Sequence, residues 1–215
     1  MALACDGLLG LLEWGNMSSG GSSTYDPRRQ AARERAALAL LNRIREPIFH
    51  ELKELLKDSD YHKGQAPHAC CLKALNQMRI SPLEAKAIGR ALRTHAELRR
   101  KLPAVLRRLR EEVRGLEDSE ERQNFDCPLL EGTRCLVHDT AKPIGCAAWN
   151  PGTSFTKVAW RAFRERDELN DRTYGTDWKL RVIPLWLKRV FARELSQWSD
   201  EPPSAAATRH YPVSR

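Results

Sequence analysis

The chemistry that this sequence could carry lies in its cysteines. The chain has 215 residues and six cysteines, and five of them fall between residues 70 and 146: Cys70, Cys71, Cys127, Cys135 and Cys146. Thiolates are soft ligands that favour zinc, copper(I) and iron–sulfur clusters, and four of them complete the shell of tetrahedral zinc or of a [4Fe–4S] cluster. In a chain that we expect to be cytoplasmic, this clustering indicates metal or redox chemistry rather than structural disulfides. We predict a metal centre on Cys70 and/or Cys71 with the three later cysteines.

The spacing of the cysteines leaves the identity of the metal open. Seven residues separate Cys127 from Cys135, ten separate Cys135 from Cys146, and the paired C-x2-C turns of zinc ribbons do not occur in the sequence. A proline follows Cys127, as in some iron–sulfur runs. We therefore favour an iron–sulfur cluster and keep zinc as the alternative. Adjacent cysteines seldom both bind one ion without backbone strain, so we expect one ligand from the pair, with Cys71 favoured. The competing interpretation is a set of buried reduced cysteines that act as small hydrophobic residues.

The order of these motifs resembles a known family. The pair Cys70-Cys71 is followed by Ile80-Ser81-Pro82-Leu83-Glu84, and then by the pattern C-P-x-L-x4-C-x-V-x5-P-x2-C, which begins at residue 127. Over residues 64–151 this arrangement resembles the YkgJ-type cysteine-cluster family, whose members are described as zinc- or iron-chelating, Fe–S-cluster-containing proteins. The resemblance implies metal binding by the matching cysteines and fixes no reaction. His68 or His138 could supply a nitrogen ligand to such a centre.

Helical periodicity dominates the rest of the chain. Asp26 and Pro27 form a start signal for a helix whose apolar positions continue to about residue 56, with Pro47 expected to kink or divide it. Ser81 and Glu84 form a capping box at the start of a second helix. Pro103 is expected to separate this helix from a charged one over residues 104–121. We expect a short helix over 158–163, a longer one over 176–196, and no strand pair.

These elements predict an all-α chain, mainly helical, with an irregular cysteine-rich metal-binding loop. Residues 124–152 show no lasting periodicity, and a metal can hold together a segment that has little core of its own. The expected organisation is a single helical domain over residues 27–199 that contains the cysteine-cluster region 64–151. Residues 1–26 and 200–215 are expected to be disordered, and Met17 is a possible true start, which would remove Cys5 from the natural protein.

Charge and tryptophan content raise a second possibility. The formal net charge is +8 and the sequence pI is about 9.4, which permits an acidic partner such as nucleic acid but also fits an arginine-rich solvated surface. The last third of the chain holds Trp149, Trp160, Trp178 and Trp186 near Arg161, Arg164, Arg166, Lys179 and Arg181. We expect these rings to pack in the core, with a nucleic-acid stacking platform as the alternative.

Three functions follow from the sequence. The first is an iron–sulfur protein with a redox, structural or accessory enzymatic role. The second is a zinc-stabilised interaction module without catalysis, and the third is a basic nucleic-acid-associated protein with a structural metal. The sequence contains no phosphate-binding loop, nucleophile elbow or zinc-protease helix, so whether the protein is an enzyme stays open. No stretch approaches the roughly 20 apolar residues of a membrane span, and we expect no membrane partner.

Overall fold

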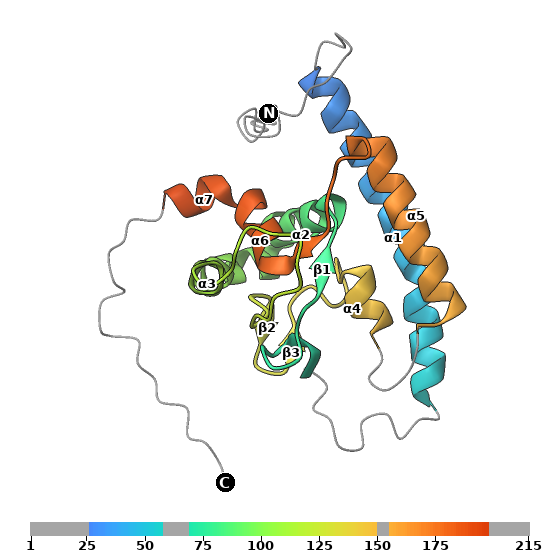
Figure 1. Cartoon of the computed structure of the whole chain (residues 1–215), viewed down its shortest axis with the longest axis horizontal. Coiled ribbons are helices and arrows are strands. Elements are labelled where there is room, and N and C mark those ends of the chain that lie inside the picture. Colours follow the sequence, from blue (N-terminus) through green and yellow to red (C-terminus); the bar gives the residue numbers. More distant parts are fainter. Residues whose placement is uncertain (1–25, 58–68, 150–154, 198–215) are drawn as a thin grey trace.

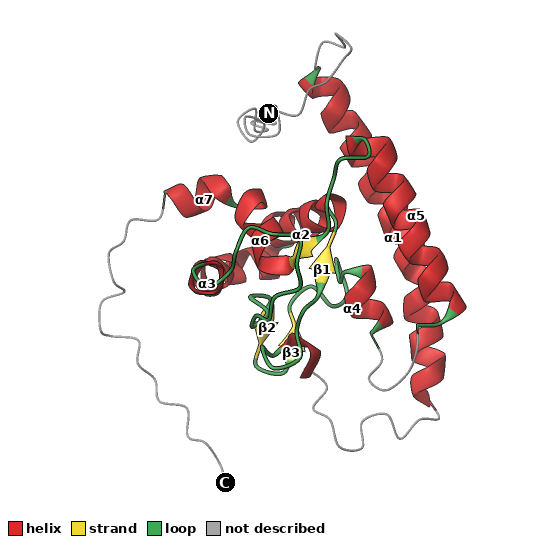
Figure 2. Ribbon diagram, viewed as in Figure 1, coloured by secondary structure: helices red, strands yellow, loops and turns green. Residues whose placement is uncertain are grey.

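A computed structural model describes residues 26–57, 69–149 and 155–197, and this part of the chain is mainly helical (Figures 1 and 2). The helices are α1 Pro27–Lys57, α2 Pro82–Thr94, α3 Ala96–Val113, α4 Ile144–Ala148, α5 Lys157–Tyr174, α6 Ile183–Val190 and α7 Ala192–Ser196, with a 3₁₀ turn η1 at Ala69–Cys71. The strands are β1 Arg79–Ile80, β2 Leu130–Glu131, β3 Arg134–Cys135 and β4 Arg181–Val182. The predictions made for Cys5, Met17, His68 and the tail from residue 200 lie outside the described residues.

Two groups of helices enclose the core. The long helices α1 and α5 lie side by side along one edge of the molecule, and α2 packs against α3 and α6 on the other side, with α4 between the groups (Figure 1). The apolar stripes of these helices meet in one buried cluster. Its largest fully buried side chains include Leu41, Ile48, Leu83, Ile88, Leu92, Leu109, Phe125, Ile144, Ile183 and Phe191. Among the described residues no helix is both long and apolar enough to cross a membrane.

The two helix starts predicted from cap residues, at Asp26 and Ser81, are confirmed. The Asp26 carboxylate accepts a hydrogen bond from the backbone N–H of Arg28 at 2.9 Å, which satisfies a donor that a helix start leaves unpaired. At α2 the Ser81 hydroxyl accepts from the Glu84 N–H at 3.3 Å, and the Glu84 carboxylate accepts from the Ser81 N–H at 2.8 Å. Both signals depend on residues within one helical turn, which is why the sequence alone reveals them.

Neither Pro47 nor Pro103 ends a helix, so the predicted division of α1 and the predicted break at Pro103 are wrong. Helix α1 runs without division through Pro47. The break expected at Pro103 lies instead at His95, whose extended backbone separates α2 from α3, and α3 continues through Pro103 to end at Val113. Pro103 is exposed, so the carbonyl that loses its helical partner there can bond to water, and the helix tolerates the ring.

The structure also corrects three other expectations. Strand pairs do form: β1 pairs antiparallel with β4, and β2 with β3. The helix expected over 158–163 is the 18-residue α5, which ends where Gly175 adopts a φ of 81°. The single helix expected over 176–196 is strand β4 followed by α6 and α7, with the helices interrupted at Phe191.

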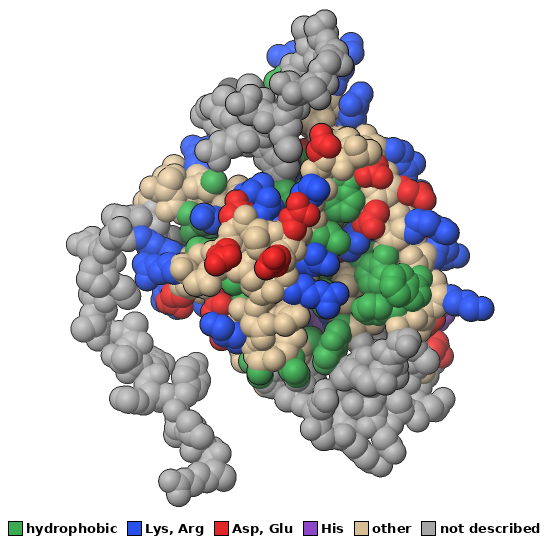
Figure 3. Space-filling view, in the orientation of Figure 1, with side chains coloured by type: hydrophobic (Ala, Val, Ile, Leu, Met, Phe, Trp, Pro, Cys, Tyr) green, Lys and Arg blue, Asp and Glu red, His purple; other side chains and the backbone are tan. Residues whose placement is uncertain are grey.

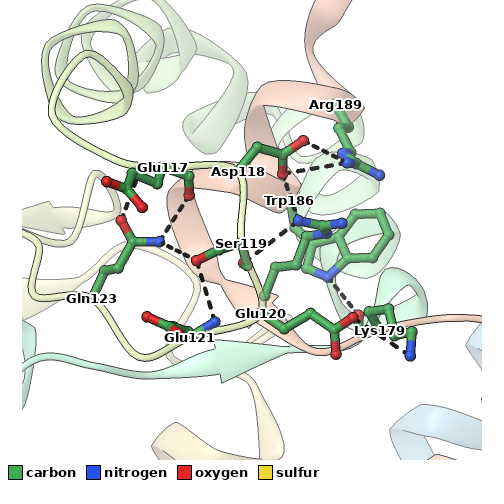
Figure 4. Close-up of polar contacts among 10 residues, drawn as sticks. Glu117, Asp118, Ser119, Glu120, Glu121, Gln123, Lys179, Trp186 and Arg189 are labelled. Carbon is green, nitrogen blue, oxygen red and sulfur yellow. Dashed lines mark hydrogen bonds and ion pairs between the residues drawn. The ribbon is translucent and has the colours of Figure 1, made fainter.

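An acidic loop after α3 forms ion pairs with residues before and within α6 (Figure 4). The Asp118 carboxylate pairs with Arg181 of β4 and, at 3.0 Å, with Arg189 of α6. Glu120 lies 3.5 Å from the Lys179 ammonium. These contacts position the chain that continues toward Phe125 and the first of the clustered cysteines after α3.

Candidate metal centre

The segments that carry the first three cysteines are joined through their backbones. The Cys127 N–H donates to the Cys71 carbonyl at 2.8 Å. Next to this bond, the Phe125 N–H donates to the Asn76 carbonyl at 3.2 Å, and the Asp126 carboxylate accepts from the Lys73 N–H at 2.7 Å. The turn that holds Cys70 and Cys71 therefore lies directly against the segment that holds Cys127.

A short hairpin brings Cys135 back to the same place. Strands β2 and β3 pair Leu130 with Cys135, and the turn between them contains Gly132 at a φ of 58°, a conformation that favours glycine. The Leu130 N–H also donates to the Cys127 carbonyl at 3.0 Å. One residue in β2 thus contacts the backbones of two predicted ligands, so the irregular loop expected here contains a defined hairpin.

Cys146 lies on α4, and α4 is held by two buried charged side chains. The Glu84 carboxylate, which is 1% exposed, accepts from the Ile144 N–H at 2.8 Å. Arg45 of α1 is 4% exposed, and its guanidinium lies 3.5 Å from the carbonyls of Thr140 and Lys142 in the turn before α4. The capping-box carboxylate of α2 therefore also fixes the start of the helix that carries Cys146.

The thiols of Cys70, Cys71, Cys135 and Cys146 interact electrostatically with one another, and Cys71 also interacts with Cys127. The sulfur atoms of Cys70 and Cys71 are 3.9 Å apart. A hydrogen bond with Cys127 raises the pKa of Cys71 to about 12, and burial raises the pKa of Cys135. Burial also raises the pKa of Cys146 well above its usual value, and negative charge on Cys135, Cys71 and Cys70 raises it further. Thiols from η1, the 127 segment, β3 and α4 are thus brought into one region of the protein.

Lys142 provides positive charge beside this thiol cluster. Its charge opposes the rise in the thiol pKa at Cys70, Cys135 and Cys146. Four thiolates around a metal carry net negative charge, and a neighbouring ammonium stabilises such a charge. The sequence prediction did not include Lys142, although it lies between two of the predicted ligands.

The described contacts of the His138 ring are with Asp139 and Phe49. Its Nδ1 lies 2.9 Å from the Asp139 carboxylate, and its ring centroid is 6.0 Å from that of Phe49. Asp139 also pairs with Arg134 at 2.6 Å, and the hydrogen bond from His138, ahead of that from Arg134, lowers the pKa of Asp139. The nitrogen-ligand role suggested for His138 stays a prediction.

The donor chemistry fits a thiolate-bound metal, while the side chains do not yet surround one. Within residues 26–57, 69–149 and 155–197, no three His, Cys, Asp or Glu side chains form a group ready to hold an ion. Five reduced thiols in one region nevertheless supply at least the four that zinc or a [4Fe–4S] cluster requires. Binding would have to draw the sulfur atoms together, as expected where metal binding completes folding.

The four tryptophans expected in the core differ in burial, and Trp149 and Trp178 are half-buried. Trp186 is 2% exposed and packs in the core, as expected, whereas Trp160 is 61% exposed on α5, so the core prediction is wrong for Trp160.

Comparison of the chain with protein-family models, curated proteins and solved structures finds no match. The resemblance to the YkgJ-type family stays a prediction that rests on the cysteine pattern.

Proposed function

We propose that this protein binds a metal centre through its clustered cysteines, with an iron–sulfur cluster as the favoured group and zinc as the alternative. The ligands are Cys127, Cys135 and Cys146 together with Cys71 or Cys70. The observation that carries the proposal is the grouping of thiols from four separate segments, each held by its own backbone or buried side-chain contacts.

The surroundings of the thiols favour ligation over simple packing. Reduced cysteines that only fill space need no cation beside them, yet the charge of Lys142 acts on three of the five. A buried carboxylate and a buried guanidinium, Glu84 and Arg45, are used to fix the segment around residues 140–146. Buried charges are costly to desolvate, so their use at this place supports a functional reason for the position of Cys146.

The kind of metal decides what the centre does. An iron–sulfur cluster bound here would accept or donate an electron, and the burial of Cys127 and the nearby charge of Lys142 would tune its potential. Zinc would stabilise the hairpin and α4 without redox chemistry. In either case the backbone contacts between Cys71 and Cys127 and the Glu84 contact to α4 orient the sulfur atoms.

Metal analysis of protein purified under anaerobic conditions tests the proposal. Iron and acid-labile sulfide together with broad visible absorption support the iron–sulfur assignment, and a colourless protein with bound zinc supports the alternative. Cys127→Ser and Cys146→Ser variants should lose most of the bound metal. Cys5→Ser is the matched control, because Cys5 is not a predicted ligand, and it should retain the metal content of the parent protein.

Comparison of Cys70→Ser with Cys71→Ser identifies the ligand from the adjacent pair, and we expect the larger loss of metal in the latter. Full-length protein that binds neither iron nor zinc when reconstituted under reducing conditions would contradict the proposal. So would Cys127→Ser and Cys146→Ser variants that retain metal as well as Cys5→Ser does.

A further inference from the structure

We propose that the exposed face of α5 around Trp160 binds single-stranded nucleic acid, an inference that does not depend on the metal. Lys157, Trp160, Arg161 and Arg164 follow the spacing i, i+3, i+4 and i+7, which places them on one face of the helix. They line an open hollow of about 260 Å³. Figure 3 shows hydrophobic side chains gathered on this side of the molecule with Lys and Arg beside them.

Trp160 is the centre of this surface and packs against two other aromatic rings. Its ring makes edge-to-face contacts with Phe155 and Phe163, with centroids 5.7 Å and 5.8 Å away. The guanidinium of the buried Arg166 lies over the Phe163 ring at 5.3 Å. Exposure of a tryptophan ring to water is unfavourable and often marks a binding site. A ring that is fixed by its neighbours and remains 61% exposed can bind a ligand with little further loss of side-chain entropy.

The cations around the ring are available to an anionic ligand. Arg161 lies 3.5 Å from Glu165 and Arg164 lies 3.9 Å from Glu168, and all four side chains are substantially exposed. Exposed pairs at such distances contribute little to stability, so the guanidinium groups can exchange these partners for phosphates. Lys157 is exposed one turn before Arg161, which extends the basic stripe along about 10 Å of helix.

This combination fits nucleic acid better than an acidic peptide. A base presents an aromatic face to Trp160, while the phosphates on either side of it meet the flanking cations. An acidic peptide would need the cations but would gain little from the exposed indole. The stripe is too short to follow a duplex groove, whereas single-strand sites can span only a few nucleotides. The net charge of +8 would help to attract such a strand.

Fluorescence anisotropy with the full-length protein tests the inference. The probes are labelled single-stranded DNA and RNA of about 12 nucleotides, titrated at salt concentrations from about 50 to 200 mM. Trp160→Ala should weaken binding by about 5- to 100-fold, and Trp160→Phe should restore part of it. The double variant Arg161→Gln/Arg164→Gln should reduce the slope of log affinity against log salt by about 1.4.

The matched control is Arg99→Gln/Arg107→Gln, which removes the same charge from exposed positions on α3. This control should keep the salt slope near that of the parent protein. The inference is overturned if the parent protein does not bind the probes at the lowest salt, or if Trp160→Ala binds as tightly as the parent. Equal effects of the α3 and α5 double variants, or displacement by poly-glutamate as efficient as by unlabelled strand, would also overturn it, since each would indicate attraction by charge alone.

Discussion

Replacing Glu84 with glutamine tests whether one buried carboxylate links α2 to the helix that carries Cys146. One carboxylate oxygen accepts from the Ser81 N–H and the other from the Ile144 N–H, both at 2.8 Å. Glutamine has nearly the same shape but only one acceptor oxygen, and its amide group would face a backbone donor. One of the two N–H groups would therefore lose its partner in a site that is 1% exposed.

The expected loss of stability follows from these contacts. A buried donor left without an acceptor costs about 1–3 kcal/mol. The Arg166 guanidinium, 3.7 Å from Glu84, would lose a second negative partner but keep Asp167 at 2.7 Å, which adds about 1 kcal/mol at most. We expect Glu84→Gln to lower the free energy of unfolding by about 1–4 kcal/mol, a large part of the roughly 5–15 kcal/mol of a typical domain.

Urea titration followed by circular dichroism measures this change, and the slope of the transition should stay that of the parent protein. Glu111→Gln is the control, because Glu111 is exposed on α3 and should change stability by no more than about 0.5 kcal/mol. If Glu84→Gln also stays within that limit, the carboxylate does not hold the two helix starts together. Metal content provides a second readout, since a displaced α4 should reduce metal binding more than the Glu111 control does.

Three further substitutions probe other parts of the structure. Gly145→Ala should cost about 1–3 kcal/mol in urea titration, because a Cβ atom there would lie 2.6 Å from the Met78 sulfur, whereas Gly115→Ala meets no atom within 4 Å and should be neutral. Burial raises the pKa of Tyr174, so above about pH 10 the unfolded chain releases a proton that the folded chain keeps, and stability falls as pH rises. Tyr174→Phe should lose less stability over this pH range than the parent does. Asp118→Asn should cost only about 0.5–1 kcal/mol, because the carboxylate is exposed, but should speed proteolysis in the loop after α3.

Cap residues in the sequence predicted helix starts well, whereas prolines did not predict helix ends. The capping box at Ser81 and Glu84 is confirmed. It could be predicted because both partners lie within one turn. The helix interruption at Phe191 has no such signal, because the apolar spacing continues across it and no glycine or proline is present. The strand pair between β1 and β4 joins residues about a hundred positions apart, and each strand has two residues, too few for the alternation by which strands are recognised.

The prediction that the cysteines act together rests on residue type, and the sequence did not reveal the contacts that hold their segments. Arginines such as Arg45 occur throughout α1, and nothing in the sequence distinguishes the one that is 4% exposed. Its role depends on the carbonyls of Thr140 and Lys142, about a hundred residues away. Likewise, the capping box explains Glu84 completely when only the sequence is considered. The sequence therefore gave no reason to expect its second contact, with the Ile144 N–H.

The contacts that hold the cysteine-bearing segments divide the thiols into two groups. Cys70, Cys71, Cys127 and Cys135 are connected through backbone hydrogen bonds between η1, the 127 segment and the β2–β3 hairpin. Cys146 belongs to α4, which is positioned by side chains from α1 and α2. A metal with ligands in both groups would join two segments that the described hydrogen bonds hold separately. Since ligation stabilises a fold by linking segments that are otherwise loosely connected, the proposed ligand set predicts that Cys146→Ser lowers metal binding and leaves the hairpin intact.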